Sequence, residues 1–460
     1  MSRFNSSSYA LQQQIQAATA VNTTLTAPIY GAYWTKGSSP TLVRTNNAVG
    51  MNAAAGTDGN FVQNDFDNAE IYREIGPVTD TLGNTFIQIP KFYIRKQDGA
   101  GFKTWQISKY QYPGFYLPKC FWNYETSQEL PYVWVGAYNA SLSAGNALQS
   151  VSGVFPLVNT DIINMRTYAQ ANNTGGLQGY QQLDIHVVDV LQTLFYVEFA
   201  TLNSQAIMQG WVNGRFVATD LATVATTSSN QIVVANATAA GYAVGQPIAI
   251  GVTQGGNEVC YGRSITAIAT YDASDMAITF DGAPVSVAVG NYLYNVGWKN
   301  GFSSNVVATS GSISSNTDGL HPCVYRGIES PWGDVWQFVD GLNITAYQPW
   351  VCNDANQYAS DVFAAPYQQL SYTVSTTNAS YVEAMGYDSA HPYAALPVTV
   401  AGSPSTYYSD YYLIAGGSQI ALVGAGWSSG ASAGLSDWDL GAGSGHSGVT
   451  LGGRLLKKAL

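Results

Sequence analysis

Charged side chains are scarce in this sequence of 460 residues, because Asp, Glu, Lys and Arg together make up only 10% of it. An average soluble domain has roughly a quarter. The 18 basic residues are outnumbered by 29 acidic ones, which gives a formal net charge of −11. Nucleic-acid-binding proteins carry a clustered basic surface, and this composition argues against one. We therefore expect no nucleic-acid partner.

Long apolar runs are also missing from the sequence. No stretch approaches the roughly 18 consecutive apolar residues that a membrane-spanning helix needs, so we expect no membrane insertion. Residues 1–25 contain short runs of Ser and Gln and lack the apolar segment of a secretory signal. We therefore expect synthesis in the cytoplasm without a signal peptide.

Cysteine and histidine are few and scattered. Cys120, Cys260, Cys323 and Cys352 lie far apart in the sequence and include no Cys-x-x-Cys pair. Such a chain is not a disulfide scaffold, so we predict free, buried thiols, although spacing alone does not exclude disulfide pairing. No His/Cys cluster has metal-ligand spacing and no EF-hand loop occurs. We expect neither a metal nor another cofactor.

Uncharged polar and aromatic residues are abundant instead, with 31 Tyr, 11 Trp and 47 Gly. Hydrophobic residues reach 46%, which is enough to bury a core and excludes wholesale disorder. Tyr and Trp give a large contact area at low entropic cost, and Ser and Asn supply adaptable hydrogen bonds. This composition favours a protein that binds other surfaces. The alternative is that the tyrosines simply cover the strands of a stable, protease-resistant coat.

Composition divides the chain into four regions, in line with about 100–200 residues per domain. Residues 1–25 are polar and are interpreted as an attachment segment. Residues 26–216 mix short strands with helices. Residues 217–300 contain β-prone runs about every 8–15 residues and predict a small inserted all-β sandwich or barrel without helices. Residues 301–460 are rich in Gly and aromatics, and isolated tryptophans near their end indicate an ordered, loop-rich fold.

Two helices are predicted within the second region. One begins at Asp161 and ends before the glycine pair at Gly175. The other is capped by Asp184 and carries a wide apolar stripe, so it packs against a sheet or another helix. His186 and Glu198 lie on this second helix and are predicted to be structural. Strands are predicted over residues 86–94, where a proline indicates an edge or bulge, and over residues 131–136.

A family resemblance begins in the segment Tyr325–Gly341, which reads YRGIESPWGDVWQFVDG. It resembles the Gly-Asn-Val-Trp signature of C-type-lectin-like domains, found in formylglycine-generating enzymes and phage adhesins, with Asp334 in place of Asn. Gly333 permits a tight turn, and bulky residues such as Trp336 anchor a loop-rich core. Asp65–Asn68 with Ile89–Tyr93, and Leu191–Ala200 with Asn203–Gln205, are also similar to phage structural proteins of this kind.

The C-terminal region resembles that of phage tropism determinants, the variable proteins of diversity-generating retroelements. Gly424–Leu435 and Gly452–Leu455 are similar to their pattern of Gly-Gly-Ser-Trp, an Ala-Gly step and a closing Gly-(Phe or Gly)-Arg. Here Gly416–Ser418 is separated from Trp427, so the opening departs from the usual spacing. In that family the positions between the scaffold residues are exposed and bind the receptor. Carried over to this sequence, these positions are Ser428, Ser429, Ala431, Ser432, Ser436, Asp437, Trp438, Asp439, Ser444, His446 and Ser447.

The resemblance implies an α+β, C-type-lectin-like fold that is split by the inserted all-β domain. It further implies a tail fibre or other adhesin on the surface of a tailed-phage virion, assembled as a homotrimer. Residues 1–25 would contact other virion proteins, and the C-terminal loops would bind a host-surface receptor, either glycan or protein. The runner-up is a structural head fibre or decoration protein without receptor specificity.

An enzyme is not expected. Formylglycine-generating enzymes need a reactive cysteine pair, and no matching motif surrounds Cys323 or Cys352. A glycan-cleaving tailspike needs two carboxylates about 5–10 Å apart. Asp437 and Asp439 would share a face of a strand, but in a Gly-rich loop they are interpreted as solvated or receptor-facing. The calcium-binding Glu-Pro-Asn and Trp-Asn-Asp motifs of sugar-binding C-type lectins are absent, so calcium-dependent sugar binding is not supported.

Overall fold

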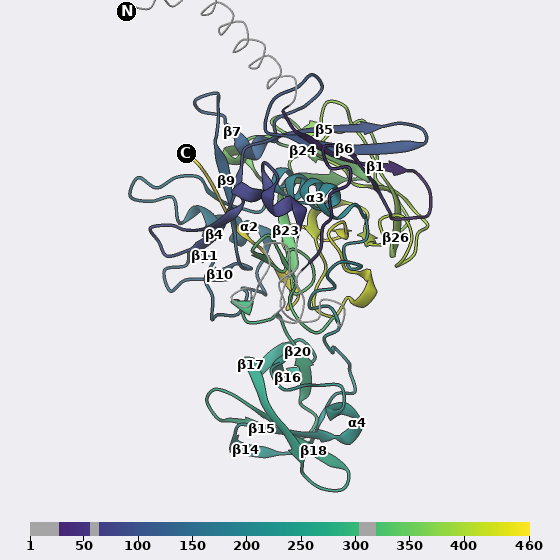
Figure 1. Ribbon diagram of the computed structural model, residues 1–460. Coiled ribbons are helices and arrows are strands. Elements are labelled where there is room, and N and C mark those ends of the chain that lie inside the picture. Colours follow the sequence, from purple (N-terminus) through teal and green to yellow (C-terminus); the bar gives the residue numbers. More distant parts are fainter. Residues whose placement is uncertain (1–26, 56–63, 303–318) are drawn as a thin grey trace, which may run out of the picture.

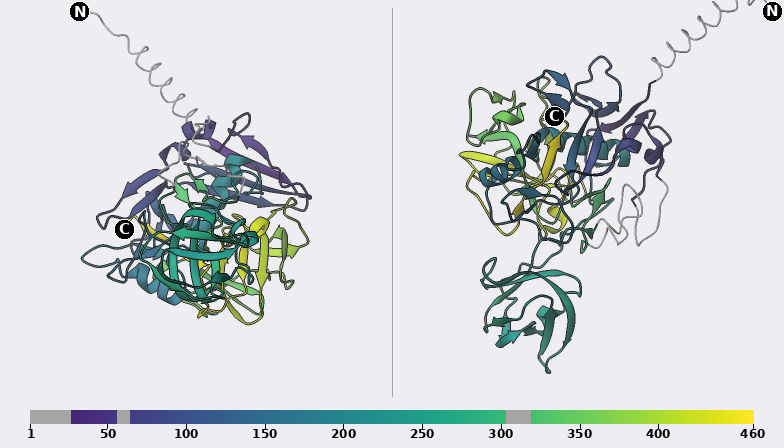
Figure 2. Two further views of the ribbon diagram at one scale, coloured as in Figure 1. Left: turned by 90° about the horizontal axis from the view of Figure 1, so that it is seen from below. Right: turned by 90° about the vertical axis from the view of Figure 1, so that its left-hand side faces the viewer.

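A computed structural model describes residues 27–55, 64–302 and 319–460 of the chain. The molecule is β-rich, with 37% strand and 11% helix, and contains a curled half-barrel sheet. It is therefore α+β in the broad sense that we expected. Figures 1 and 2 show one larger body, built from both ends of the chain, and a smaller lobe formed by the middle of the sequence. The predicted attachment segment, residues 1–25, lies outside the described residues.

The first sheet of the body has four antiparallel strands in the order β2-β1-β6-β5. Side chains of β6 alternate between partly exposed and buried, which is the period of a strand with one face on the core. The predicted strand over residues 86–94 is two strands, because the chain crosses to another sheet after Pro90. The strands of the first sheet are β1 (Ile29–Thr35), β2 (Val43–Asn46), β5 (Tyr93–Asp98) and β6 (Phe102–Ser108).

The second sheet joins the two ends of the chain. Its order is β12-β32-β9-β4-β3, so the last strand of the sequence lies between strands from the first half. Leu456 of β32 pairs with Val135 on one side and with Gln181 on the other. The strand predicted over residues 131–136 is confirmed as β9. The strands are β3 (Gly76–Thr79), β4 (Thr85–Pro90), β9 (Tyr132–Gly136), β12 (Tyr180–Gln182) and β32 (Leu455–Lys458).

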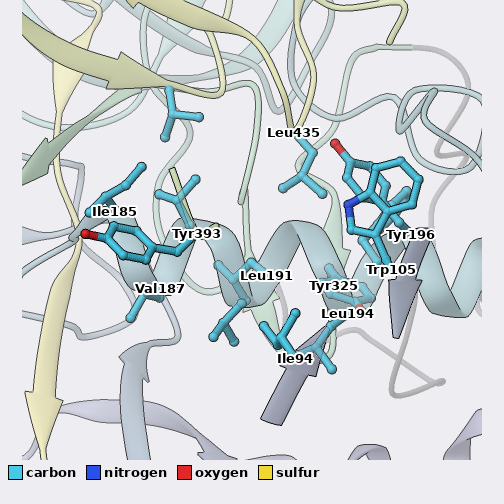
Figure 3. Packing of buried hydrophobic residues seen from close by; sticks show 14 of the residues in the cluster. Ile94, Trp105, Ile185, Val187, Leu191, Leu194, Tyr196, Tyr325, Tyr393 and Leu435 are labelled. Atoms are coloured by element: carbon cyan, nitrogen blue, oxygen red, sulfur yellow. The ribbon is translucent and has the colours of Figure 1, made fainter. Parts of the chain in front are cut away.

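Both predicted helices are confirmed, and each begins at the predicted cap. In α2 (Ile162–Gln170) the Asp161 carboxylate accepts a hydrogen bond from the Asn164 amide, 2.8 Å away. In α3 (Ile185–Phe199) the Asp184 carboxylate accepts one from the Val187 amide at 2.9 Å. Every residue of α3 is buried, so the helix forms the centre of the body rather than covering one side of it (Figure 3).

The third sheet is built from the last third of the chain. Its order is β25-β24-β23-β29-β30-β28-β26-β27, and β31 pairs in parallel with β23. The Gly-rich C-terminal stretch supplies three of these strands, which agrees with the predicted ordered fold. The strands are β23 (Trp336–Thr345), β24 (Gln348–Val351), β25 (Gln368–Gln369), β26 (Ser380–Met385), β27 (Pro397–Val400), β28 (Tyr411–Ile414), β29 (Ser418–Val423), β30 (Trp438–Leu440) and β31 (Leu451–Gly452).

Short strand pairs and 3₁₀ turns connect these sheets. The pairs are β7 (Trp122–Asn123) with β8 (Gln128–Glu129), β10 (Ser141–Leu142) with β11 (Leu148–Gln149), and β21 (Val324–Tyr325) with β22 (Ile328–Glu329). The 3₁₀ turns are η1 (Asp65–Asn68), η2 (Tyr72–Glu74), η3 (Lys119–Phe121), η5 (Ala355–Gln357) and η6 (Gly430–Ser432).

The smaller lobe falls within residues 217–300, where we predict an inserted β domain. A six-stranded and a two-stranded sheet enclose an apolar core of their own. The expectation that this region has no helix is wrong by one turn, α4 (Asn236–Ala239), because an Ala-rich tetrapeptide bridges two strands. The strands are β13 (Ala222–Val224), β14 (Thr226–Ser229), β15 (Gln231–Ala235), β16 (Pro247–Thr253), β17 (Gly256–Thr270), β18 (Asp275–Phe280), β19 (Val285–Val287) and β20 (Tyr292–Asn295).

The chain enters and leaves this lobe at adjacent points. The Arg215 amide donates to the side-chain oxygen of Asn295 at 2.7 Å, and the Asn295 amide donates to the Arg215 carbonyl at 2.9 Å. Arg215 also forms an ion pair with Asp220, 2.8 Å away. The two connections to the body are therefore held side by side.

All four cysteines are free and buried, as predicted. Among residues 27–55, 64–302 and 319–460, no helix is both long enough and apolar enough to cross a membrane.

Candidate functional site

The turn at Gly333 and Asp334 forms a hub between the lobe and the C-terminal region. The carboxylate of Asp334 accepts hydrogen bonds from the Trp298 amide and the Asn139 side chain, each at 2.6 Å, and its carbonyl accepts one from the Trp427 amide at 2.7 Å. Burial raises the pKa of Asp334 to about 7. Gly333 has a φ of +70°, and a Cβ there would lie 2.9 Å from a Val212 methyl group. The turn thus needs glycine for both conformation and space.

Arg454, the arginine of the closing Gly-Gly-Arg, is a buried scaffold residue. Burial lowers the pKa of its guanidinium to about 10, and carboxylates such as Glu329 partly oppose this shift. Its hydrogen bonds reach both halves of the chain, so it fixes the C-terminal region to the body. The acceptors are the side chains of Gln337 (2.8 Å) and Asn139 (2.9 Å) and the carbonyls of Gly136 (2.9 Å), Glu329 (2.7 Å) and Ser330 (2.9 Å).

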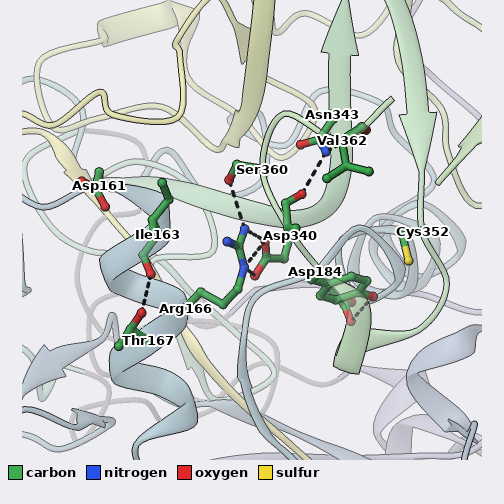
Figure 4. A network of polar contacts seen from close by, with 12 residues as sticks. Asp161, Ile163, Arg166, Thr167, Asp184, Asp340, Asn343, Cys352, Ser360 and Val362 are labelled. Carbon is green, nitrogen blue, oxygen red and sulfur yellow. Dashed lines mark hydrogen bonds and ion pairs between the residues drawn. The ribbon is translucent and has the colours of Figure 1, made fainter. Parts of the chain in front are cut away.

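A second network fixes α2 and its neighbours to the third sheet (Figure 4). Arg166 of α2 donates to both carboxylate oxygens of Asp340 on β23, at 2.5–3.2 Å, and to the Ser360 hydroxyl at 3.3 Å. Asn343 on the same strand donates to the Val362 carbonyl at 3.2 Å. These bonds make the base of the C-terminal loops rigid.

The first group of predicted receptor-binding residues forms one surface turn around η6. Ser428 and Ala431 are exposed, and Ser429 and Ser432 are partly exposed. Gln205, which lies beyond the end of α3, donates to the Gly430 carbonyl at 3.0 Å and holds the turn in place. We call residues 428–432 the η6 turn.

The second group forms a separate turn. His446 and Ser447 are exposed, whereas Ser444 is partly exposed and donates to the Asp361 carboxylate at 2.6 Å. Asp439 is partly exposed; burial raises its pKa, and the Gly441 amide and nearby His446 partly oppose the shift. In the part of the chain that the structure describes, no hydrogen bond joins this turn to the η6 turn.

The expected exposure is wrong for Ser436, Asp437 and Trp438, each of which is only 1% exposed. The cause is β30, which lies inside the third sheet between β29 and β28. Trp438 packs in the main core, and the Ser436 hydroxyl is hydrogen-bonded to that of Tyr196 on α3. These three residues are therefore inaccessible to a receptor in this structure.

Asp437 and Asp410 form a buried acidic pair. Among the described residues, neither carboxylate oxygen of Asp437 has a hydrogen-bonding partner, and Asp410 accepts one bond, from the Ser436 amide at 2.7 Å. Burial raises the pKa of both carboxyl groups well above the ordinary value, and the charge of Asp410 raises that of Asp437 further. No group of three or more His, Cys, Asp or Glu side chains in the described segments could hold a metal ion.

No sequence pattern predicted a polar pocket that lies in the body between β7, β12, η5 and β32. It has a volume of about 290 Å³, and its lining includes Trp122, Tyr124, Tyr180, Asp354 and Lys458. The aromatic run from Phe121 to Tyr124 was the one available signal in the sequence. We call this cavity the Trp122 pocket.

No protein-family model matches this chain, and no curated protein matches it.

Proposed function

We propose that this protein is an adhesin of a tailed-phage virion, with a C-type-lectin-like body that binds a host-surface receptor without covalent chemistry. The observation that carries the proposal is the η6 turn, a small-residue surface loop on a scaffold of buried Trp, Arg and Asp side chains. Recognition residues commonly lie on loops that a rigid scaffold positions. In this proposal the exposed members of the predicted set, Ser428, Ala431, His446 and Ser447, contact the receptor.

The composition supports the same proposal. A surface with few charges and many Tyr, Ser and Asn side chains makes adaptable but individually modest contacts. A homotrimer, which the family resemblance implies, would display three copies of each turn. Multivalent display raises apparent affinity by about 10²–10⁴ without any new type of contact.

The adhesin is tested with the purified, fluorescently labelled protein on a panel of bacterial strains. Ser428→Arg and Ala431→Arg place bulky charge on the η6 turn, and we expect each to reduce cell binding at least tenfold with an unchanged melting temperature. Ser405→Arg and Ala401→Arg are matched controls, because both residues are exposed outside the predicted set. Equal cell binding by all four variants would show that the η6 turn is not part of the contact surface.

Failure to bind any strain would favour the structural alternative. A head fibre or decoration protein would then be located on the capsid by imaging of whole virions. A position at the tail tip supports the adhesin.

A further inference from the structure

We propose that the Trp122 pocket binds one sugar unit of an uncharged glycan. This inference rests on the proposed adhesin function and names the chemical class of its receptor. It adds a second contact region, on elements that the family resemblance does not mark as receptor-binding.

The pocket is assembled from four separate chain segments, which makes it a property of the fold rather than of one loop. They are β7 with the residues after it, the stretch from the end of α2 to β12, η5, and β32 with the C-terminal residues. Its volume of about 290 Å³ lies at the lower end of the range of small-molecule sites, roughly 300–1,000 Å³. That size suits a single sugar ring rather than a long chain.

Aromatic side chains with free polar groups line the pocket. The Lys119 ammonium lies 5.3 Å from the centre of the Trp122 ring. In the part of the chain that is described, neither the indole N–H of Trp122 nor the hydroxyl of Tyr124 has a hydrogen-bonding partner in the protein, and both residues are partly exposed. A sugar presents C–H groups to an aromatic ring and hydroxyls to such polar groups, so both parts find partners here.

Lys458 forms part of the pocket wall and is held in place by the body. The residue is 4% exposed, and its ammonium donates one hydrogen bond, to the Lys119 carbonyl at 3.3 Å. Burial and this bond fix the side chain before any ligand arrives, so this wall of the pocket is preorganised and the entropic cost of binding is lower.

Other polar side chains of the pocket are held in place by the protein. The Asp354 carboxylate accepts hydrogen bonds from the Asn356 amide at 3.0 Å and from the Gln357 side chain at 2.7 Å. Asn173 bonds the backbone of Tyr180 in both directions, each at 2.9 Å. Such fixed acceptors and donors provide a defined pattern for hydroxyl groups.

The charges favour an uncharged ligand. Lys458 is the one cation among the lining residues, all of which the structure describes, while Glu125 and Asp354 are acidic. Burial raises the pKa of Asp184, and the positive charge of nearby Lys458 partly opposes the shift. The Lys119 ammonium over the Trp122 ring and the Lys457 ammonium over the Tyr180 ring offset these carboxylates. The charges around the pocket therefore nearly balance, and a neutral polyhydroxylated ring suits it better than a charged sugar.

The test is a glycan array that carries neutral oligosaccharides of hexoses, 6-deoxyhexoses and N-acetylhexosamines beside acidic ones with uronic or sialic acid. We expect binding to a neutral member, followed by calorimetric titration with that oligosaccharide. Trp122→Ala should weaken the Kd at least tenfold, and Tyr124→Phe, which removes only a hydroxyl, should weaken it severalfold. Tyr132→Ala is the control, because Tyr132 is also a half-buried tyrosine and lies outside the pocket.

The outcomes separate this inference from the adhesin proposal. Binding to acidic glycans alone, or a neutral-glycan Kd unchanged in both pocket variants, overturns the inference. A protein that binds cells but no glycan also overturns it and leaves the adhesin in place. A protein that binds a neutral glycan through the pocket but no bacterial cell supports the pocket and overturns the adhesin.

Discussion

The buried carboxyl groups of Asp437 and Asp410 make stability depend on pH. Burial raises the pKa of Asp437 above its ordinary value of 3.8, so the folded state holds a proton that the unfolded state releases. Stability is therefore lost as pH rises from that ordinary value through the raised one.

Replacement of Asp437 by Asn removes this proton linkage. We expect the melting temperature of the wild type to fall relative to that of Asp437→Asn as pH rises from about 4 to 8. Calorimetry at several pH values measures the difference between the two proteins. Parallel melting profiles across this range would contradict the raised pKa.

Glu198 and Arg326 form a buried ion pair on which the centre of the body depends. The Glu198 carboxylate accepts hydrogen bonds from the Arg326 guanidinium at 2.5 and 3.1 Å, from the Tyr325 hydroxyl at 2.9 Å and from the Asn64 side chain at 2.7 Å. This arrangement agrees with the structural role that we predict for Glu198.

Arg326→Met leaves the buried Glu198 carboxylate without its main partner. We expect a loss of about 3–5 kcal/mol in the free energy of unfolding, measured by urea denaturation. The double variant Arg326→Met with Glu198→Leu should recover part of that loss, because it removes the orphaned charge. A double variant less stable than Arg326→Met alone would rule out this explanation.

At the scale of elements, local chemistry was predictable and long-range pairing was not. Asp161 and Asp184 cap their helices through side-chain bonds to amides three residues on, so their role can be inferred from a short window. Asp437 sits in an equally polar window, yet β30 is buried between two strands that lie elsewhere in the sequence. Its burial depends on pairing that no local pattern records.

The Trp122 pocket shows the same limit. Trp122 belongs to the first third of the sequence and Lys458 to its last residues, and both line the pocket because β32 inserts between β12 and β9. The aromatic run near Trp122 is apparent in the sequence. That Lys458 and Asp354 lie in the same pocket is not. From the sequence we expect a recognition protein, but no pattern in it predicted this pocket.

We expect the body to fold without the lobe. It has its own core, and its two connections are clamped together by Arg215 and Asn295. Replacement of residues 217–294 by two glycines should leave a body that unfolds cooperatively, as seen by calorimetry and near-UV circular dichroism. A body that aggregates or melts without a cooperative transition would show that the lobe is needed for folding.

At the scale of the whole molecule, the expected homotrimer is directly measurable. Light scattering should give about three times the chain mass of 49.0 kDa. Few charged groups mean little electrostatic repulsion when neutral polar faces pack side by side. A monomeric mass at all micromolar concentrations would contradict the homotrimer, and with it the gain in affinity expected from multivalent display.

The position of β32 also determines when, during synthesis, the body can complete its folding. Because this strand lies between β12 and β9, the body cannot complete its second sheet until residues 455–458 have left the ribosome. The lobe is finished much earlier and can fold as a unit while the body still waits. A ribosome that stalls near the end of the message would thus release a chain with a folded middle and an open sheet edge, the form most exposed to aggregation.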